Sequence, residues 1–263
     1  VTGVQTCALP ISEATQINFD QLKVSCASCS LRELCIPQGM TDDELKLIDT
    51  VIERKKPVHK NDYLFRAGDT NRSIYAVLSG SVKTLVDNPN GEEQIVGFHL
   101  PGELLGMDGF SGDAHTCSAV ALETSSVCEF PLESLDEVCH VVPSIQYAMR
   151  RIMGREVTKD HAMLLLLGRM SAEEKLASFL ISLSKRMAQR HWKPSEFNLT
   201  MPRQDIANYL GLAVETVSRL FAHLQDAEII EVDRRRVNIC DMERLQAIVG
   251  DSDAINAVKA RQG

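Results

Sequence analysis

Three cysteines lie close together near the start of the chain, at Cys26, Cys29 and Cys35. Their Cys-x2-Cys-x5-Cys spacing allows one loop to bring three sulfurs to a single inorganic centre, because the intervening Ala27 and Ser28 are small and leave the backbone free to curl. Thiolates in a set of four are the ligands of a zinc ion or of an iron-sulfur cluster. The loop therefore predicts a metal site that takes its fourth ligand from elsewhere in the chain.

A structural zinc site is the main alternative to a cluster, and spacing by itself leaves both open. Zinc sites commonly use two short Cys-x2-Cys pairs, whereas this loop has one pair and reaches Cys35 only after a longer gap. That gap suits the wider face of a 4Fe-4S cluster better than a single small ion. Free thiols would not require such a spacing, and a disulfide framework has the least support because nothing else in the sequence indicates export.

The spacing leaves the identity of the fourth ligand open. Residues 1–12 lack both an initiator methionine and the basic start of a signal peptide, so we expect them to be partly an artefact and a cysteine among them to be a poor ligand. The remaining cysteines are Cys7, Cys117, Cys128, Cys139 and Cys240.

The composition is that of a globular protein, with 263 residues of which 44% are hydrophobic, enough for two modest domains. No apolar run approaches the length that crosses a bilayer, which predicts a cytoplasmic protein without a membrane partner. Basic and acidic residues balance from Ser171 onward, so the whole net charge of -8 lies before that residue. The overall acidity therefore does not exclude DNA binding by the C-terminal third, which carries a basic cluster at Arg234, Arg235 and Arg236.

The first half of the chain has the pattern of a small β domain. We expect an N-terminal extension over 1–25, a cluster-binding loop over 26–36 and a β-roll sensor domain over 40–142. After a helical pattern over residues 40–53, short segments rich in β-branched and aromatic residues alternate with Gly, Pro and Asn turns, as in an all-β roll. The predicted strands cover residues 63–65, 73–78, 81–86, 94–98 and 126–130.

One long helix is predicted over residues 143–170. Its inner positions recur at alternating spacings of four and three, as in a coiled coil, which predicts a homodimer. The seam consists of Met153, Val157, Asp160, Leu164 and Leu167. The carboxylate of Asp160 would face its symmetry mate at a cost of about 1 kcal/mol or more, which would make dimerisation weak and open to control. The alternative is a solvated Asp160 at the flank of the seam.

Residues 171–250 have the pattern of a winged helix-turn-helix, followed by a tail over 251–263, so the whole chain is expected to be an α+β protein. A capping box at Ser171 begins the first helix of this domain, and Gly211 marks the turn between two helices. The expected elements after the capped helix are a short strand over 197–200, helices over 202–212 and 213–220, and a hairpin wing over 229–239.

A recognition helix presents its early residues to base edges, so the second helix of the motif supplies Val214, Glu215, Ser218 and Arg219, with Arg203 of the first helix beside them. Arg219 can donate two hydrogen bonds to guanine, and Glu215 can accept from cytosine or orient Arg219. Each such bidentate contact discriminates by about 1–3 kcal/mol. The expected partner is double-stranded DNA, and the alternative is a surface ion pair between Glu215 and Arg219.

These features together resemble the FNR branch of the CRP/FNR family of bacterial transcription regulators, from about Cys26 to Ile248. The resemblance implies a cyclic-nucleotide-binding-like jelly roll as the sensor domain, a dimerisation helix and a winged helix-turn-helix. It implies regulation of transcription and no enzymatic activity. The residues that carry it are the cysteine loop and residues 66–69, 97–100, 122–129, 208–212 and 214–219.

In that family three loop cysteines and one cysteine on a sensor strand hold a 4Fe-4S cluster. Cys128 stands in the matching context, which implies that Cys117 and Cys139 are spectators. The resemblance implies a dimer on DNA while the cluster is intact, conversion by oxygen to a 2Fe-2S form, and loss of the dimer with Asp160 as part of the switch. It also implies a palindromic TTGAT-type operator, and contacts to RNA polymerase from the turn at Gly91 and Glu92.

A sibling branch of the family binds cyclic AMP, but residues 73–149 contain no arginine to meet its phosphate, so we expect no cyclic nucleotide. Val214 stands where that branch reads guanine with an arginine, which implies a different operator. A haem or small-molecule sensor of the same fold, with His99 as a ligand, is the alternative function. A cupin-like metalloenzyme has less support, because His59, His99 and His115 are scattered.

Overall fold

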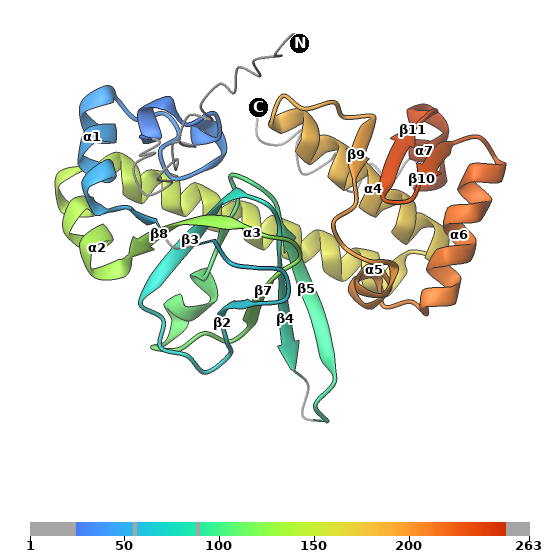
Figure 1. Cartoon of the computed structure of the whole chain (residues 1–263), viewed down its shortest axis with the longest axis horizontal. Coiled ribbons are helices and arrows are strands. Elements are labelled where there is room, and N and C mark those ends of the chain that lie inside the picture. The colour runs from blue at the N-terminus through green and yellow to red at the C-terminus, as the bar shows by residue number, and fades with distance from the viewer. Residues whose placement is uncertain (1–24, 55–56, 88–89, 251–263) are drawn as a thin grey trace, which may run out of the picture.

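A β-roll and a smaller winged-helix unit lie along one long helix, α3 (Pro143–Arg169), with helices α1 and α2 near its beginning (Figure 1). This computed structural model describes residues 25–54, 57–87 and 90–250. Within these ranges no helix has the length and apolar character that crossing a membrane requires. The order of strands and helices confirms the expected α+β architecture.

The cysteine segment is built from two short 3-10 helices, η2 (Cys26–Ser28) and η3 (Arg32–Leu34), and leads into α1 (Asp42–Val51). A capping box begins α1: the Thr41 hydroxyl accepts from the Glu44 backbone N–H, and the Glu44 carboxylate accepts from the Thr41 N–H. This exchange satisfies two backbone donors that the helix itself leaves unpaired. The predicted helix over 40–53 is thereby confirmed, slightly shortened.

The β-roll consists of two four-stranded antiparallel sheets whose inner faces share a core around Val77, Val82 and Val127. All five predicted strands are present, whereas β1, β6 and β7 were not predicted; β1 and β6 have only two residues each. In order, the first sheet contains β1 (Glu53–Arg54), β8 (Ser126–Pro131), β3 (Ser73–Ser79) and β6 (Leu104–Leu105). The second contains β2 (Tyr63–Phe65), β7 (Ser118–Ala121), β4 (Val82–Asp87) and β5 (Glu93–His99).

Helix α2 (Leu132–Val141) follows β8 and leads directly into α3, which has 27 residues. The buried side chains of α3, Ile145, Ala148 and Ile152, all lie in its first half, where they pack against the roll and α2. The second half buries none of its residues within the described chain. The predicted long helix is confirmed, and α2 is an addition whose brief amphipathic pattern is not evident in the sequence.

The winged helix begins with α4 (Ala172–Gln189), and the capping box predicted at Ser171 is present. Gly211 ends α5 in the left-handed conformation, with φ of 63°, which a residue without Cβ adopts at little cost and which turns the chain into α6. The predicted helix-turn-helix and wing are both present. After α4 come β9 (Glu196–Asn198), α5 (Arg203–Leu210), α6 (Val214–Asp226), β10 (Ile230–Asp233), β11 (Arg236–Ile239) and α7 (Met242–Ile248).

The roll and the winged helix share a hydrophobic core. Ile95 and Phe98 of β5 belong to the same buried cluster as Phe179 of α4, and Tyr209 of α5 packs against it. The Phe98 ring centroid lies 5.0 Å from that of Tyr209 and 6.1 Å from that of Phe179. Because side chains of both the roll and the winged helix are buried in one core, the winged helix is docked on the roll rather than freely tethered to it.

Polar contacts fix the register of this docking. Lys83 of β4 forms an ion pair of 2.9 Å with Asp205 of α5. The Asn208 side chain pairs with the edge of β5, since its Oδ1 accepts from the Ile95 N–H at 2.6 Å and its Nδ2 donates to the Glu93 carbonyl at 2.8 Å. The first helix of the helix-turn-helix therefore continues the hydrogen bonding of the second sheet.

Gly80, at the turn before β4, offers a test of this fold. Its φ is 80°, and a Cβ there would lie 2.8 Å from both the Ser125 Cα and the Thr124 carbonyl oxygen. Gly80→Ala should lower the free energy of unfolding by about 1 kcal/mol for the left-handed backbone and by about 1–3 kcal/mol more for overpacking. Urea unfolding of the full chain measures this loss.

Gly68→Ala is the matched control, because Gly68 has φ of 88° with nothing within 4 Å of an added Cβ. It should show the backbone loss without the overpacking loss. Equal destabilisation by the two substitutions would contradict the packing assigned to the Gly80 turn.

Candidate functional site

The cysteine loop is a series of tight backbone turns. The Cys29 N–H donates to the Cys26 carbonyl at 3.2 Å, the Arg32 N–H to the Cys29 carbonyl at 3.2 Å, and the Cys35 N–H to the Arg32 carbonyl at 3.3 Å. Each cysteine thus lies where one turn meets the next. The small Ala27, Ser28 and Ser30 permit the curl of the first part of the loop, as the sequence predicts, whereas η3 is formed by the larger residues Arg32–Leu34.

Contacts with α1 and with the roll hold the loop in place. Asp49 of α1 accepts a hydrogen bond of 2.8 Å from the Cys26 N–H and another from the Ser25 hydroxyl. On the other side the loop packs on the turn after β5, where a Cβ on Gly102 would lie 3.0 Å from the Leu34 Cβ. The sequence gives no signal for Asp49, because its role depends on the folding of α1 against the loop.

Cys128 lies on β8, opposite Ala76 of β3 and Arg54 of β1. Its side chain is half-buried and packs, with those of Cys26 and Cys35, against one apolar cluster of the roll. Residues far apart in the chain therefore meet at one place, because β8 runs beneath the cysteine loop.

Electrostatics confirm that these sulfurs are neighbours. Burial raises the pKa of the Cys35 thiol to about 12, and the nearby Cys128 and Cys29 sulfurs add to the rise. Burial, Asp49, Cys35 and Cys128 all raise the pKa of Cys26. Bare thiolates are therefore unfavourable here, and a positively charged metal centre would offset that cost while releasing the thiol protons.

The chemistry of the donor set fits an iron-sulfur cluster or zinc, since Cys26, Cys35 and Cys128 are soft thiols that pack against one apolar cluster and Cys29 belongs to the same loop. In the described ranges, however, no three His, Cys, Asp or Glu side chains stand close enough to form a metal site as they are. The assignment of Cys26, Cys29, Cys35 and Cys128 as ligands stays a prediction.

The other cysteines lie in different surroundings. Cys117 is buried in the core between the two sheets, and burial together with Asp108 raises its pKa to about 12. Cys240 is exposed after the wing, and Cys7 lies outside the described residues. Cys139 of α2 packs against the same apolar cluster as the cysteine loop, whereas Cys117 packs in a different one. The position of Cys117 therefore argues more strongly against a ligand role than that of Cys139.

The histidines proposed for haem or cupin chemistry do not come together in the described part of the chain. His99 is inside the protein, with a ring nitrogen 3.0 Å from the Thr84 hydroxyl, and burial lowers its pKa to about 4. His115 stacks on Phe65 with ring centroids 3.8 Å apart. His59 is exposed. The environment of His99 is that of a neutral packing residue.

Helix α6 presents the predicted reading residues on its outer face. Glu215, Ser218 and Arg219 are exposed, while Val214 is half-buried and packs against the core. Arg219 lies 3.5 Å from the Thr216 hydroxyl, and among the described ion pairs none joins it to Glu215. The outer face of α6 is therefore open to a base edge.

Arg203 has a different environment from the other predicted contacts. It is the first residue of α5, and its guanidinium lies 3.4 Å from the centroid of the Phe221 ring on α6. Burial lowers the pKa of Arg203, which remains charged. A cation over an aromatic face stabilises the packing of the two helices, so its main visible role is to brace α6.

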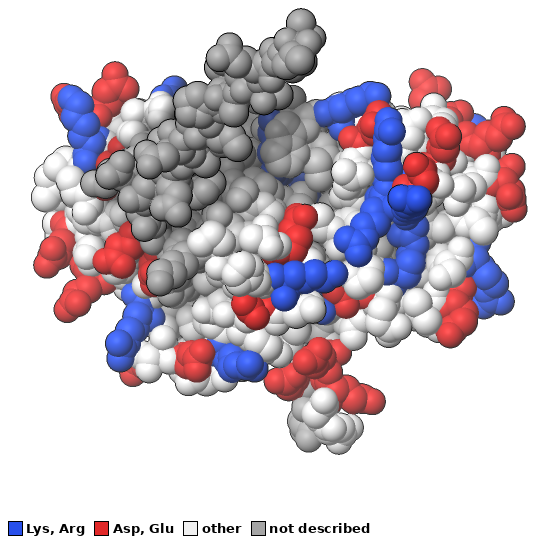
Figure 2. Space-filling view, viewed as in Figure 1, with Lys and Arg blue, Asp and Glu red and all other residues white. Residues whose placement is uncertain are grey.

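Basic side chains gather over α4, β9 and the wing, where Figure 2 shows a band of Lys and Arg. At the wing turn Arg234, Arg235 and Arg236 are exposed, and Arg234 has a φ of 55°. Arg236 also forms an ion pair with Glu196 of β9. This band is the electrostatic surface that a phosphate backbone requires, although the chain as a whole is acidic.

The predicted dimer seam lies on the second half of α3. Met153, Val157, Leu164 and Leu167 are large apolar side chains that are exposed, with Leu164 at 69%, and Asp160 is exposed beside them. An apolar stripe of this kind on a single chain is typical of a surface that a partner covers. The structure does not decide whether Asp160 lies in the seam or at its flank.

The turn predicted to contact RNA polymerase joins β4 to β5. Gly91 and Glu92 are exposed there, and Gly91 has φ of 77°. The hairpin projects away from α3 (Figure 1). Its position is accessible, and its role stays a prediction.

Comparison with known proteins identifies the family of this chain. The Cyclic nucleotide-binding domain family matches residues 55–141, and the Crp-like helix-turn-helix domain family matches residues 174–248. The chain is 45% identical over 239 residues to the Fumarate and nitrate reduction regulatory protein of Vibrio cholerae serotype O1, covering 91% of this chain and 96% of that one. It belongs to the FNR branch of the CRP/FNR family.

Other members agree with this assignment. The chain is 44% identical over 227 residues to the Transcriptional activator protein Anr of Pseudomonas protegens, covering 86% of this chain and 93% of that protein. The solved structure of FixK2 from Bradyrhizobium japonicum is 28% identical, with a TM-score of 0.69 over 75% of this chain and 97% of FixK2. This FNR-type protein is therefore a DNA-binding transcription regulator and not an enzyme, and its predicted fold class is confirmed.

The predicted cluster ligands of this FNR-type regulator can be tested by paired substitutions. Cys128→Ala should lose most of the iron, because it removes a sulfur beside Cys26 and Cys35. Cys117→Ala should retain the iron, because Cys117 packs in the other core. Iron and sulfide content after purification without air is the measurement. Equal iron content in the two variants would overturn the assignment.

Asp160→Ala tests the seam of the FNR-type dimer. Removal of a like-charged pair should strengthen dimerisation in air by about 1 kcal/mol, roughly fivefold in the dissociation constant. Sedimentation velocity measures the shift. Asp160→Asn separates charge from apolar gain and should give most of the effect. An unchanged monomer for both variants would place Asp160 outside the seam.

Proposed function

We propose that this protein is an oxygen-sensing transcription regulator that binds DNA when oxygen is absent. The observation that carries the proposal is the meeting of the cysteine loop with Cys128 of β8 against one apolar cluster. Cys26, Cys29, Cys35 and Cys128 would hold a 4Fe-4S cluster. When bound, that cluster supplies a centre that oxygen converts to a 2Fe-2S form.

The chain's own residues would convert this chemistry into a change of assembly. The cysteine loop is held by Asp49 of α1, and α1 packs beside α2, which leads into α3. A change in the loop therefore acts on elements next to the dimer helix. We infer that the protein is a homodimer with the cluster intact and separates into monomers after oxygen exposure, with Asp160 making the pairing marginal.

DNA recognition would follow from the dimer. Two copies of α6 would read a palindrome of TTGAT-type half-sites, with Glu215, Ser218 and Arg219 at base edges and the basic wing on phosphates. The β4–β5 turn at Gly91 and Glu92 would meet RNA polymerase. A regulator that acts in this way on bacterial DNA would act in the cytoplasm.

Two observations weigh against competing ligands. The roll has no arginine over residues 73–149 to meet the phosphate of a cyclic nucleotide, although its family is named for that ligand. His99, the candidate for haem, is half-buried, and its ring nitrogen lies 3.0 Å from the Thr84 hydroxyl. The names of the relatives, which refer to fumarate and nitrate reduction and to transcriptional activation, support an anaerobic role.

The test combines absorption and DNA binding on protein purified without air. A broad charge-transfer shoulder in the visible range with iron and sulfide is expected, whereas haem would give a sharp Soret band and zinc neither. Binding to a duplex with two inverted TTGAT half-sites should weaken by at least an order of magnitude after exposure to air, with a fall in sedimentation coefficient. Protein without iron, or binding that is insensitive to air, would refute the proposal.

A further inference from the structure

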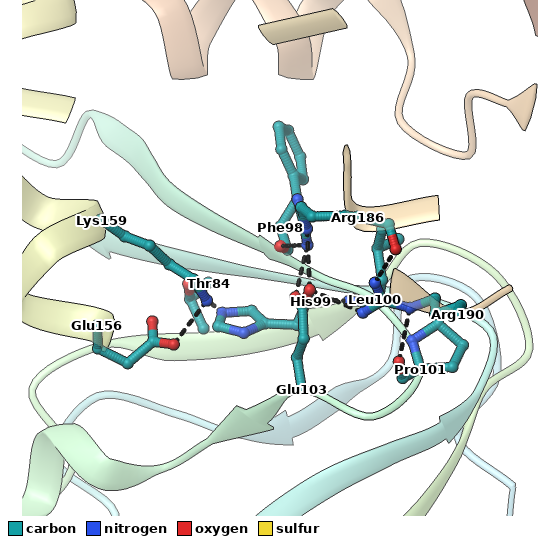
Figure 3. Close-up of polar contacts among 10 residues, drawn as sticks. All are labelled: Thr84, Phe98, His99, Leu100, Pro101, Glu103, Glu156, Lys159, Arg186 and Arg190. Carbon is teal, nitrogen blue, oxygen red and sulfur yellow. Dashed lines mark hydrogen bonds and ion pairs between the residues drawn. The ribbon is translucent and has the colours of Figure 1, made fainter. Parts of the chain in front are cut away.

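Glu103 joins the sensor domain to the first helix of the winged-helix domain (Figure 3). It lies in the turn between β5 and β6, and its carboxylate meets two arginines of α4. Arg186 donates to it at 2.9 Å and 2.5 Å through two nitrogens, and Arg190 donates at 2.7 Å. The Glu103 side chain is 14% exposed and that of Arg190 is 1% exposed. We call these three residues the Glu103 clamp.

Further hydrogen bonds to the backbone of residues 98–101 hold the Glu103 clamp in place. Arg186 also donates to the Phe98 carbonyl at 2.6 Å, and Arg190 donates to the Pro101 carbonyl at 2.7 Å. Glu103 accepts in addition from the Leu100 N–H at 3.1 Å. Bidentate guanidinium pairs fix orientation as well as distance. The α4 helix is therefore tied to residues 98–103 at several points and cannot rotate without breaking buried charged hydrogen bonds.

The dimer helix also reaches this place. Although burial by itself raises the pKa of Glu103, Arg186, Lys159 and Arg190 together hold it well below its ordinary value. Lys159 belongs to α3, and Figure 3 shows it beside His99 with its partner Glu156. Two elements thus meet at the carboxylate itself, the turn after β5 and α4, while the exposed Lys159 of α3 adds positive charge nearby.

The same turn supports the cysteine loop. Gly102, with φ of 89°, lies against Leu34 and Leu31, and both leucines stand between Cys29 and Cys35. Its neighbours Pro101 and Glu103 are the residues that bind Arg190 and Arg186. The loop therefore contacts the middle residue of a three-residue turn whose two outer residues bind α4.

We propose that Glu103 is a positioning residue for DNA recognition, which holds α4, and with it α6, at a fixed orientation to the dimer helix α3. Because the turn that carries Glu103 also supports the cysteine loop, the clamp gives that loop a route to the DNA-binding domain within one subunit, separate from dimerisation. This second statement rests on the proposed function of the loop.

A fixed orientation has a measurable consequence. Two reading helices held rigidly to one dimer axis accept a single separation of half-sites, about one turn of the double helix. Loosening the clamp should let each α6 adjust on its own. Glu103→Gln should therefore reduce several-fold the ratio of DNA affinities between the preferred and the longer half-site separations, while leaving the iron content unchanged. A merely structural role for Glu103 would not produce this result.

The experiment uses the full chain, purified without air, and duplexes with two inverted TTGAT half-sites at the preferred separation or one and two base pairs further apart. A readout without DNA accompanies it: trypsin cleavage after Arg169, which is exposed at the end of α3 before α4. Cleavage there should be several-fold faster in Glu103→Gln. Glu133→Gln is the matched control, because Glu133 is exposed on α2, away from the clamp, and should leave both readouts unchanged.

Wild-type separation preference and cleavage rate in an iron-loaded Glu103→Gln variant would overturn the proposal. If that variant does not fold, Arg186→Gln decides by the same two readouts, because it leaves Glu103 paired with Arg190. Failure of the proposed function is a separate result, in which the wild-type chain binds no palindrome or holds no iron. In that case the cleavage rates alone decide whether the clamp fixes α4.

Discussion

A carboxylate taken out of water between two guanidinium groups determines how the two halves of this molecule are arranged. Removing one partner of the Glu103 clamp is costly, because the remaining charge would be left buried with fewer partners. The neighbouring contacts follow from this docking: the Phe98 ring packs between Phe179 and Tyr209, and Asn208 extends the edge of β5. The winged helix is consequently held against the second sheet with the outer face of α6 turned to solvent.

The cysteine loop is likewise held by packing around a polar side chain. Its backbone turns need small residues between the cysteines, and its position needs Asp49 on one side and the Gly102 turn on the other. Cys128 comes from a strand whose place is set by pairing with β3 and β1. Burial makes free thiolates unfavourable at this position, so the site has a thermodynamic reason to bind a cationic centre.

Helix α3 connects these regions and carries two kinds of surface. Its first half is covered by the roll, while its second half leaves a row of large apolar side chains exposed in the single chain. Such a row is typical of a surface that a partner covers, as the predicted dimer seam requires. The basic band over α4 and the wing lies on the DNA-binding half (Figure 2), whereas the net negative charge comes from residues before Ser171.

Local patterns were enough to identify the strands of the roll, the long helix, the helix-turn-helix and the cysteine loop, because each depends on residues within a few positions of one another: a spacing of thiols, an alternation, a heptad, a glycine at a turn. Short β6 and β7, helix α2, the anchor Asp49, the bracing role of Arg203 and the Glu103 clamp were decided only by the tertiary structure. Each of these depends on a partner tens of residues away, and an isolated Glu or Arg in a sequence carries no mark of the partner that burial will give it.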